Sequence, residues 1–477
     1  MSFDTMSAAS EDSIAEDRGY RNSLTKIEPY GIEHIPDVER HGRPRSQFFL
    51  WFAAGMNFPI VVLGFSAAYF GLPFWAAVLA ILLAGVTSAA GMGYLSAMGV
   101  RLGIPQQMQG RGPLGFIGNL FPVAYVNVFA GVGWAAVTVI LGGQAIALLT
   151  DVPFWLSALI LMGIQLGVAV IGYNLIHFLQ RILSFVLVVG FVFITIVAAA
   201  NGRVVNTANT AAEGFNGVGG WIIFFGWFFS FIVAWMPFAS DYSRYLPNTP
   251  GNRRGAGWAT MLGNFITLAW MGILGTVLGS VTTASDSIGA LKDVMGPWAP
   301  IGLGIVALSS FTQNFLNVYG GAISIQTMGL PVKRHTGVIF ICVASYLVAL
   351  WGQGGFNEGF TAFLNLTAYC IAPYVAVLVC DYLFGGRRTD RGLREVFDKS
   401  RKFEWGFVAW AVGVAASSPF WMSSIYTGPI AAAFPQVGDL SYYVGAAIAV
   451  GVYFATRRLP RLARGKAVAA PAGQETV

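Results

Sequence analysis

Charged side chains are scarce in this sequence. Asp, Glu, Lys and Arg make up 10% of its 477 residues, whereas soluble proteins carry about 25%. Hydrophobic residues reach 56% and aromatic residues 14%. This composition excludes an ordinary soluble domain and is typical of a protein that crosses a membrane many times.

Cysteine and histidine are also rare. All three cysteines fall in apolar stretches, which excludes a disulfide framework and a cysteine-based zinc motif. The four histidines are scattered over separate polar segments. We therefore expect no metal site and no cofactor.

Twelve apolar runs are long enough to cross about 30 Å of hydrocarbon, which takes about 20 helical residues. They lie at approximately 46–71, 73–100, 117–149, 153–173, 178–200, 219–246, 257–281, 298–328, 335–353, 358–384, 404–425 and 436–456. The polar segment before them lacks the apolar core of a signal peptide. The sequence thus predicts an all-α membrane protein with twelve transmembrane helices.

Basic residues fall almost entirely on one side of the membrane if the spans alternate. With the N-terminus in the cytoplasm, only Arg203 and Lys292 of the 28 Lys and Arg residues lie outside, as the positive-inside rule requires. We predict a plasma-membrane protein with both termini in the cytoplasm. The net charge of +6 then reflects topology, and no nucleic-acid partner is expected.

Two spans carry a proline near mid-membrane, Pro59 in "FFLWFAAGMNFPIVVLGF" and Pro237 in "WIIFFGWFFSFIVAWMPFASDYSRYLP". Proline removes a backbone hydrogen bond and interrupts a helix, and either one alone could be a simple kink. These spans are the first and the sixth, which open consecutive five-span units. Interrupted helices at matching places indicate an inverted-repeat transporter with its site at the midplane.

This pattern divides the chain into predicted parts. Residues 1–45 form a largely disordered cytoplasmic arm, and residues 46–384 form the core, with repeats at 46–200 and 219–384. Two additional transmembrane helices at 404–456 follow, and residues 457–477 form a cytoplasmic tail. Spans one, two, six and seven are expected to rock as a bundle against spans three, four, eight and nine.

The eighth span has no charge but a polar centre, "LSSFTQNFLNVYGG". Ser310, Gln313, Asn314 and Asn317 occupy positions i, i+3, i+4 and i+7, on one stripe of a helix. Unsatisfied amides in hydrocarbon are costly, so this stripe cannot face lipid. Hydrogen bonds between helices could explain a single Asn, whereas three amides favour a polar ligand or a water-filled path.

Two tryptophans also lie near mid-span, away from the interfacial belts that tryptophan usually occupies. Trp134 shares one face of span three with Asn127 and Thr138, and Trp235 lies two residues before Pro237. Core packing is the alternative for each. Indoles stack on planar rings, and amides match the edges of nucleobases. Since no charged residue lies near the middle of any span, a neutral, flat, amide-like solute fits best.

From about Tyr30 to Arg458 the chain resembles nucleobase:cation symporter family one, in its purine-cytosine permease branch. The stretches that carry this resemblance are "GIEHIPDVER", "LWFAAGMNFP", "LGIPQQMQGRGPLG", "GWAAV", "AWMPFASDYSRYLP", "TQNFLNVY" and "FLNLTAYCIAPYVAVLVCDY". The resemblance implies a LeuT-like 5+5 inverted repeat with discontinuous helices one and six. It also implies import of a neutral nucleobase, cytosine or a purine, with H+ or Na+.

Other activities stay open. Allantoin or hydantoin, uracil, and vitamin-like heterocycles are alternative substrates, and an uncoupled facilitator or channel is an alternative mechanism. We do not expect an enzyme, because the spans show no buried nucleophile with a base or metal. The expected partners are the small heterocycle and membrane lipid, and the protein is expected to be a monomer.

The resemblance also implies roles for particular residues. Two tryptophans would sandwich the substrate, amides of span eight would read its edge, and the unwound part of span one would line the pocket: Trp134, Trp235, Gln313, Asn314, Asn317, Asn57 and Phe58. One turn after Trp134 the family commonly has Asn or Gln, whereas this chain has Thr138. This departure leaves the identity of the substrate open.

The coupling ion is open too. In sodium-dependent relatives, carbonyls of span one and hydroxyls of span eight hold the ion, and the matching groups here are Ala54, Thr312 and, as an imperfect replacement, Ser309. For protons, favoured by the branch that the chain resembles, the candidate is Asp241, about 9 Å along the helix from Trp235 by the rise per residue. An ion pair between Asp241 and Arg244 is an equal alternative.

Overall fold

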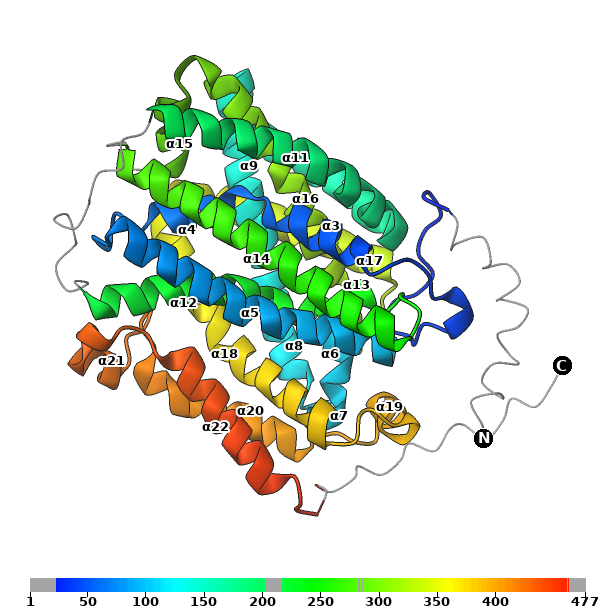
Figure 1. Cartoon of the computed structure of the whole chain (residues 1–477). Helices are drawn as coiled ribbons and strands as arrows, with labels where there is room; N and C mark the ends of the chain where they lie inside the picture. The colour runs from blue at the N-terminus through cyan, green and yellow to red at the C-terminus, as the bar shows by residue number, and fades with distance from the viewer. Residues whose placement is uncertain (1–22, 202–216, 282–283, 285, 461, 463–477) are drawn as a thin grey trace.

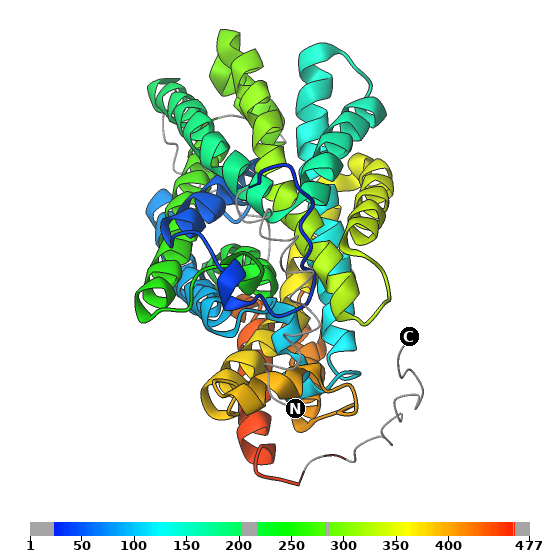
Figure 2. The same ribbon diagram turned by 90° about the vertical axis from the view of Figure 1, so that its right-hand side faces the viewer.

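The computed structural model describes residues 23–201, 217–281, 284, 286–460 and 462. Within these ranges the chain is mostly helical, and its long helices pack side by side (Figure 1). One end of the molecule holds the six arginines that are buried among the described residues, Arg40, Arg111, Arg244, Arg334, Arg387 and Arg401, and we call it the basic end. Figure 2 looks onto this end, which the dark blue N-terminal segment crosses.

The predicted spans coincide with helices. Those of the first predicted repeat are α3 (Arg45–Gly55) with α4 (Phe58–Phe65), α5 (Phe74–Leu102), α8 (Leu120–Val126) with η2 (Asn127–Gly133) and α9 (Trp134–Thr150), α10 (Phe154–Ile171) and α11 (Tyr173–Asn201). Short helices α6 (Gln106–Gln109) and α7 (Arg111–Leu114) connect α5 to α8. The helices that follow are α12 (Val218–Trp235) with η3 (Met236–Phe238) and α13 (Ala239–Ser243), α14 (Pro250–Val281), α15 (Ser287–Met295), α16 (Ala299–Thr327), α17 (Arg334–Gly352), α18 (Phe356–Phe384), α19 (Asp390–Phe397), α20 (Trp405–Ser417) and α22 (Ser441–Thr456).

Ten of the predicted spans are confirmed by helix length. In the described part of the chain, nine helices are long and apolar enough to cross a membrane, and the bent pair α3 and α4 adds a tenth. The last two predicted spans fall on shorter apolar helices, Trp405–Phe420 and Ser441–Thr456. The first of these ends earlier than expected because Pro419 lies in the 3-10 turn that follows α20 and cannot continue a helix.

Span one is broken where the sequence predicts. Helices α3 and α4 meet at 54°, and the buried side chain of Asn57 bridges the gap between them. Its amide donates to the carbonyl of Ala54, and its Oδ1 accepts from the backbone N–H of Ile60 at 3.3 Å. Asn57 is thus the N-cap of α4, and Pro59 occupies the first turn, where its missing N–H leaves no bond unmade.

Span six is interrupted in a milder way. The 3-10 turn Met236–Phe238 holds Pro237 and separates α12 from α13. The stretch Val218–Ser243 nevertheless forms one span without the sharp bend seen in span one. The interruption predicted at Pro237 is therefore a local change of hydrogen bonding.

Span three contains a π-helix, Asn127–Gly133, that the sequence analysis did not predict. The amide of Asn127 donates to the carbonyl of Gly321 on α16 at 2.8 Å. A Cβ added to Gly131 would lie 3.2 Å from the Cα of Gly321, so the two backbones are in close contact here. Such turns are frequent at functional sites, and this one ends directly before Trp134.

Packing divides the spans into the predicted groups. Helices α3, α4, α5, α12 and α14 pack against one another, whereas α9, α10, α16 and α17 share a hydrophobic core of their own. Helices α18, α20 and α22 form a third group at the edge of the molecule (Figure 1). Within the first group, Gly93 and Gly257 let α5 and α14 approach: a Cβ on Gly93 would lie 2.5 Å from the carbonyl oxygen of Gly257. Small residues allow such close packing in membranes.

The described part of the N-terminal arm differs from the prediction. Residues 1–22 lie outside the described residues, but residues 23–44 pack against the basic end, so the prediction of a largely disordered arm is wrong for them. The reason is Glu28, which is 4% exposed. Its carboxylate lies 3.3 Å from the guanidinium of Arg244 and 3.8 Å from that of Arg334, so it supplies the counter-charge that two buried arginines need.

Candidate functional site

Amide side chains of α10 and α16 form a hydrogen-bonded relay in the protein interior. The Nδ2 of Asn314 donates to the carbonyl of Ala135 on α9 at 3.0 Å and to Oε1 of Gln165 on α10 at 2.9 Å. The Nδ2 of Asn317 donates to Oδ1 of Asn314 at 2.8 Å. All three amide residues are fully buried. The relay confirms that Asn314 and Asn317 face helices and not lipid.

The relay has a fixed polarity. A backbone carbonyl can only accept, so the contact with Ala135 forces Asn314 to turn its NH2 group that way and its oxygen toward Asn317. Asn317 must then use its NH2 group, which leaves its Oδ1 free. This oxygen has no hydrogen-bond partner in the described part of the protein. The site therefore presents a carbonyl acceptor, which suits an N–H donor on a ligand.

Gln313 offers further groups. It is fully buried, yet neither Nε2 nor Oε1 has a hydrogen-bond partner among the described residues. Leaving such a group unpaired costs about 1–3 kcal/mol, so a water molecule or a polar ligand that bonded to Gln313 would be stabilised here. Gln313 lies seven residues before Gly320 and so on the same helix face. Gly320 packs against Phe238, which places this face of α16 against the interruption of span six.

Trp134 begins α9 directly after the π-helix and is 1% exposed. Its ring makes edge-to-face contacts with Phe231 of α12, at 5.0 Å between centroids, and with Phe363 of α18, at 5.3 Å. Its Nε1 has no hydrogen-bond partner in the described regions. An unpaired indole N–H in the interior is a further group that a polar ligand could satisfy.

Trp235 is the last residue of α12 and is 4% exposed. Its ring centroid lies 5.8 Å from that of Trp51 on α3 and 6.1 Å from that of Phe238. Both predicted indoles are thus buried and packed on aromatic side chains of the protein. That the two rings sandwich a substrate remains a prediction.

The remaining predicted pocket residues, Asn57, Phe58 and Thr138, are all buried. Asn57 and Phe58 lie at the break of span one. The hydroxyl of Thr138 donates to the carbonyl of Trp134 on its own helix at 2.8 Å. Its hydrogen is therefore already engaged, which limits what Thr138 can offer to a ligand.

The predicted sodium ligands are oxygen atoms of Ala54 on α3 and of Ser309 and Thr312 on α16. The hydroxyl of Ser309 donates to the Val306 carbonyl at 2.8 Å, and that of Thr312 donates to the Ser309 carbonyl at 2.7 Å. Each hydroxyl oxygen can still accept or bind a cation. The Ala54 carbonyl already accepts from Asn57.

Asp241 lies on α13 and is fully buried. Its Oδ1 accepts from the backbone N–H of Gln106, the first residue of α6, at 2.9 Å. Its Oδ2 has no hydrogen-bond partner among the described residues. Among the described residues no ion pair joins Asp241 to Arg244, whose guanidinium pairs with Glu28 and donates to the carbonyl of Gly31.

Three residues of this region were not predicted from the sequence. Gln165 is the one amide in the apolar stretch 153–173, and that isolation was an available signal. Trp51 and Phe231 contact the two predicted tryptophans, but nothing distinguishes them from other aromatic residues in their spans.

Comparison with known proteins defines the class to which this fold and site belong. Residues 34–445 match the family described as "Permease for cytosine/purines, uracil, thiamine, allantoin". The chain therefore belongs to this family of membrane permeases, and the predicted membership in nucleobase:cation symporter family one is confirmed.

Named relatives cover nearly the whole chain. It is 28% identical to a putative purine-cytosine permease, YxlA, of Bacillus subtilis, over 92% of this chain and 97% of that protein. It is also 28% identical to the purine-cytosine permease fcyB of Emericella nidulans, over 90% and 88%. The vitamin B6 transporter TPN1 of Saccharomyces cerevisiae is 26% identical over 74% of this chain and 65% of that protein.

A solved structure shares the fold. Mhp1, a nucleobase-cation-symport-1 family transporter in a closed conformation with bromovinylhydantoin bound, superimposes with a TM-score of 0.74 at 20% identity. The match covers 90% of this chain and 94% of that one. The predicted LeuT-like fold is thereby confirmed, and the chain is an integral membrane transporter.

Proposed function

We propose that this protein is a secondary active symporter that imports a neutral nucleobase, cytosine or a purine, across the plasma membrane. The observation that carries the proposal is the set of buried polar groups without partners, at Gln313, Asn317 and Trp134, beside two interrupted spans. A nucleobase offers donors and acceptors on its edge and a flat face for an indole. The family description and the names of two relatives, the permease of Bacillus subtilis and that of Emericella nidulans, support this class of substrate.

The proposed orientation places both termini and the basic end in the cytoplasm. It is supported by the arginines gathered there, whereas Lys292 lies on α15 at the opposite end (Figure 1). The proposed mechanism is alternating access, in which the group containing α3, α4, α5, α12 and α14 rocks against the group containing α9, α10, α16 and α17.

The coupling ion is proposed to be H+ or Na+. The carboxylate of Asp241, with one oxygen unpaired, supplies a proton carrier near the interruption of span six. The lone pairs of Ser309 and Thr312, with the carbonyl of Ala54, supply the neutral oxygens that suit Na+. Uptake driven by a Na+ gradient alone, or by an H+ gradient alone, distinguishes the two ions.

A second class of substrate has its own support. The hydroxyl of Thr138 is engaged within its helix, so this position lacks the free amide that a nucleobase reader would use. The resemblance to a vitamin B6 transporter supports a vitamin-like heterocycle as the substrate. Uracil and allantoin are named in the family description, and a hydantoin is bound in the Mhp1 structure.

Uptake into proteoliposomes tests the proposal. Labelled cytosine, adenine, uracil, allantoin and pyridoxine are offered separately under an inward Na+ gradient and an inward H+ gradient. We expect saturable accumulation of cytosine or a purine that collapses on adding an ionophore for the driving ion, with the substrate recovered unchanged. Accumulation of pyridoxine or allantoin alone would refute the nucleobase assignment, and uptake indifferent to ionophores would identify a facilitator.

Replacing Trp235 tests the stacking role. Phenylalanine keeps a flat face, so Trp235→Phe should weaken substrate binding less than Trp235→Ala, in which about 1–3 kcal/mol of stacking is lost. The measurement is the substrate dissociation constant of each purified variant. Equal losses in the two variants would show that the ring is not a stacking surface.

A further inference from the structure

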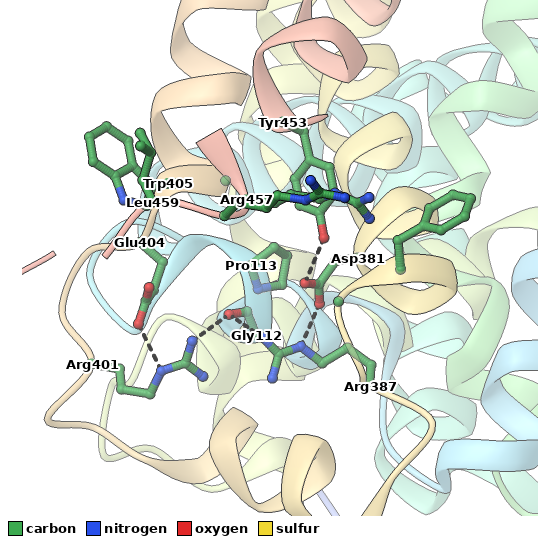
Figure 3. Close-up of a pocket in the computed structure, with 14 residues that line it drawn as sticks. Gly112, Pro113, Asp381, Arg387, Arg401, Glu404, Trp405, Tyr453, Arg457 and Leu459 are labelled. Carbon is green, nitrogen blue, oxygen red and sulfur yellow. Dashed lines mark hydrogen bonds and ion pairs between the residues drawn. The ribbon is translucent and has the colours of Figure 1, made fainter. Parts of the chain in front are cut away.

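A cavity opens at the basic end, away from the proposed substrate site. It has a volume of about 310 Å³ and lies between α7, the end of α18, the start of α20 and the end of α22 (Figure 3). Helices α18, α20 and α22 belong to the third packing group and α7 is a connecting helix, so no wall of the cavity belongs to the two groups that surround the amide relay. The cavity is therefore independent of the proposed transport path.

The wall of this cavity is held by matched charges. Arg387 pairs with Asp381, and Arg401 pairs with Glu404 at 2.8 Å. Both guanidinium groups also donate to the carbonyl of Gly112, at 2.9 and 3.0 Å (Figure 3). Each of these four charged residues is less than one-tenth exposed. Glu395 pairs with both arginines as well, at 2.9 Å and 3.4 Å, so the charge of Arg387 and Arg401 is fully matched by carboxylates in the wall.

Unmatched positive charge lies at the rim. Arg457 and Arg458 line the cavity and are exposed, and none of the ion pairs among the described residues engages either of them. The guanidinium of Arg457 lies 5.6 Å from the ring centre of Phe384 and 4.8 Å from that of Phe454. Cation–π contacts hold it in place without neutralising its charge. The cavity therefore favours an anion.

Apolar surface adjoins these arginines. Phe384 is 54% exposed and Leu459 is 47% exposed, and both line the cavity. The indole of Trp405, also in the lining, donates to the carbonyl of Pro460 at 2.8 Å. The cavity thus combines basic residues with apolar residues and a tryptophan, and it lies at the ends of membrane helices. This combination matches a ligand with a phosphate head and a hydrocarbon tail.

We propose that this cavity binds the phosphate headgroup of an anionic phospholipid. Arg457 and Arg458 contact the phosphate, while Phe384 and Leu459 contact the start of the acyl chains. With the basic end in the cytoplasm, the lipid belongs to the inner leaflet. A soluble organic phosphate carries the same anionic group but has no hydrocarbon chain to contact the exposed apolar residues. The lipid therefore matches both the basic and the apolar part of the cavity.

Lipid binding to the purified full chain tests this proposal without reference to any transport substrate. Delipidated protein is titrated with phosphatidylglycerol, with phosphatidylcholine and with soluble glycerol 3-phosphate, and bound lipid is counted by native mass spectrometry. We expect phosphatidylglycerol to bind tightly and the other two weakly. The double variant Arg457→Gln with Arg458→Gln should bind phosphatidylglycerol at least about 10-fold more weakly, because each basic residue contributes to attraction of anionic lipid.

Matched variants control for non-specific effects. Arg181→Gln with Arg254→Gln removes two exposed charges from the same end of the molecule, outside the cavity, and should leave lipid binding unchanged. The double variant Arg457→Lys with Arg458→Lys keeps both positive charges and should retain most of the phosphatidylglycerol binding. This result would attribute the loss in the Gln variant to the missing charges and not to misfolding. Equal weakening in the Arg181 and Arg254 control, or undiminished binding in the Gln variant, would overturn the proposal. So would glycerol 3-phosphate binding as tightly as the lipid.

Discussion

Replacing Asn317 by alanine should nearly abolish nucleobase uptake, with a fall in transport efficiency of about 100-fold, near the upper end of the range for loss of a specific contact to a base. The variant removes the free Oδ1 that the relay presents and leaves Oδ1 of Asn314 without its donor. Initial uptake rates in proteoliposomes, normalised to the amount of protein in the membrane, give this value.

Asn264 provides a matched control for this variant. It is 6% exposed on α14, and its amide donates to the carbonyl of Thr260 on its own helix at 2.9 Å. We expect Asn264→Ala to keep most of the uptake. Wild-type uptake in Asn317→Ala, or the same loss in both variants, would remove Asn317 from the substrate site.

Replacing Glu28 by alanine should strongly destabilise the protein, by about 3–5 kcal/mol, the cost of leaving a buried charge without its partner. Its carboxylate pairs with Arg244 and also accepts from the hydroxyl of Tyr319 at 2.8 Å. Arg244 and Tyr319 belong to spans six and eight, on opposite sides of the proposed rocking interface. The loss should appear as a lower unfolding temperature of the detergent-purified protein.

Two further variants separate this effect from a general effect of charge. Glu33 is exposed in the same segment, and its carboxylate accepts from the backbone N–H of Gly31 at 2.6 Å. Glu33→Gln removes the charge but keeps an acceptor oxygen, so it should leave the unfolding temperature nearly unchanged. Adding Arg244→Leu to Glu28→Ala removes both members of the pair and should recover part of the stability. If Glu28→Ala unfolds at the same temperature as the wild type, the arm does not hold the basic end together.

The helices were predictable because the requirement to cross hydrocarbon leaves a strong record in the sequence. A span such as 153–173 has few alternatives to a helix, and α10 occupies Phe154–Ile171. The break at Asn57 was also predictable, because Pro59 has no backbone N–H to donate to the preceding turn of the helix. The π-helix before Trp134 left no comparable record, because its register depends on contact between Gly131 and Gly321, which are far apart in the chain.

Within the site, residue types were easier to predict than their roles. The amide stripe required burial, and Gln313, Asn314 and Asn317 are all buried. The direction in which each amide points depends on the carbonyl of Ala135 and on Gln165, which the helix period of α16 cannot reveal. Glu28 could not be singled out either, because one glutamate in a polar segment looks the same whether it faces water or two buried arginines.

The central claim is that a flat, neutral ring binds between Trp134 and Trp235 with its edge at Gln313 and Asn317. A cryo-electron microscopy structure of the protein with the nucleobase that it accumulates tests this claim most directly. We predict an indole stacked on the ring and an N–H of the ring or its amino group within hydrogen-bond distance of Oδ1 of Asn317. A nucleobase bound elsewhere, with these amides still without partners, would contradict it.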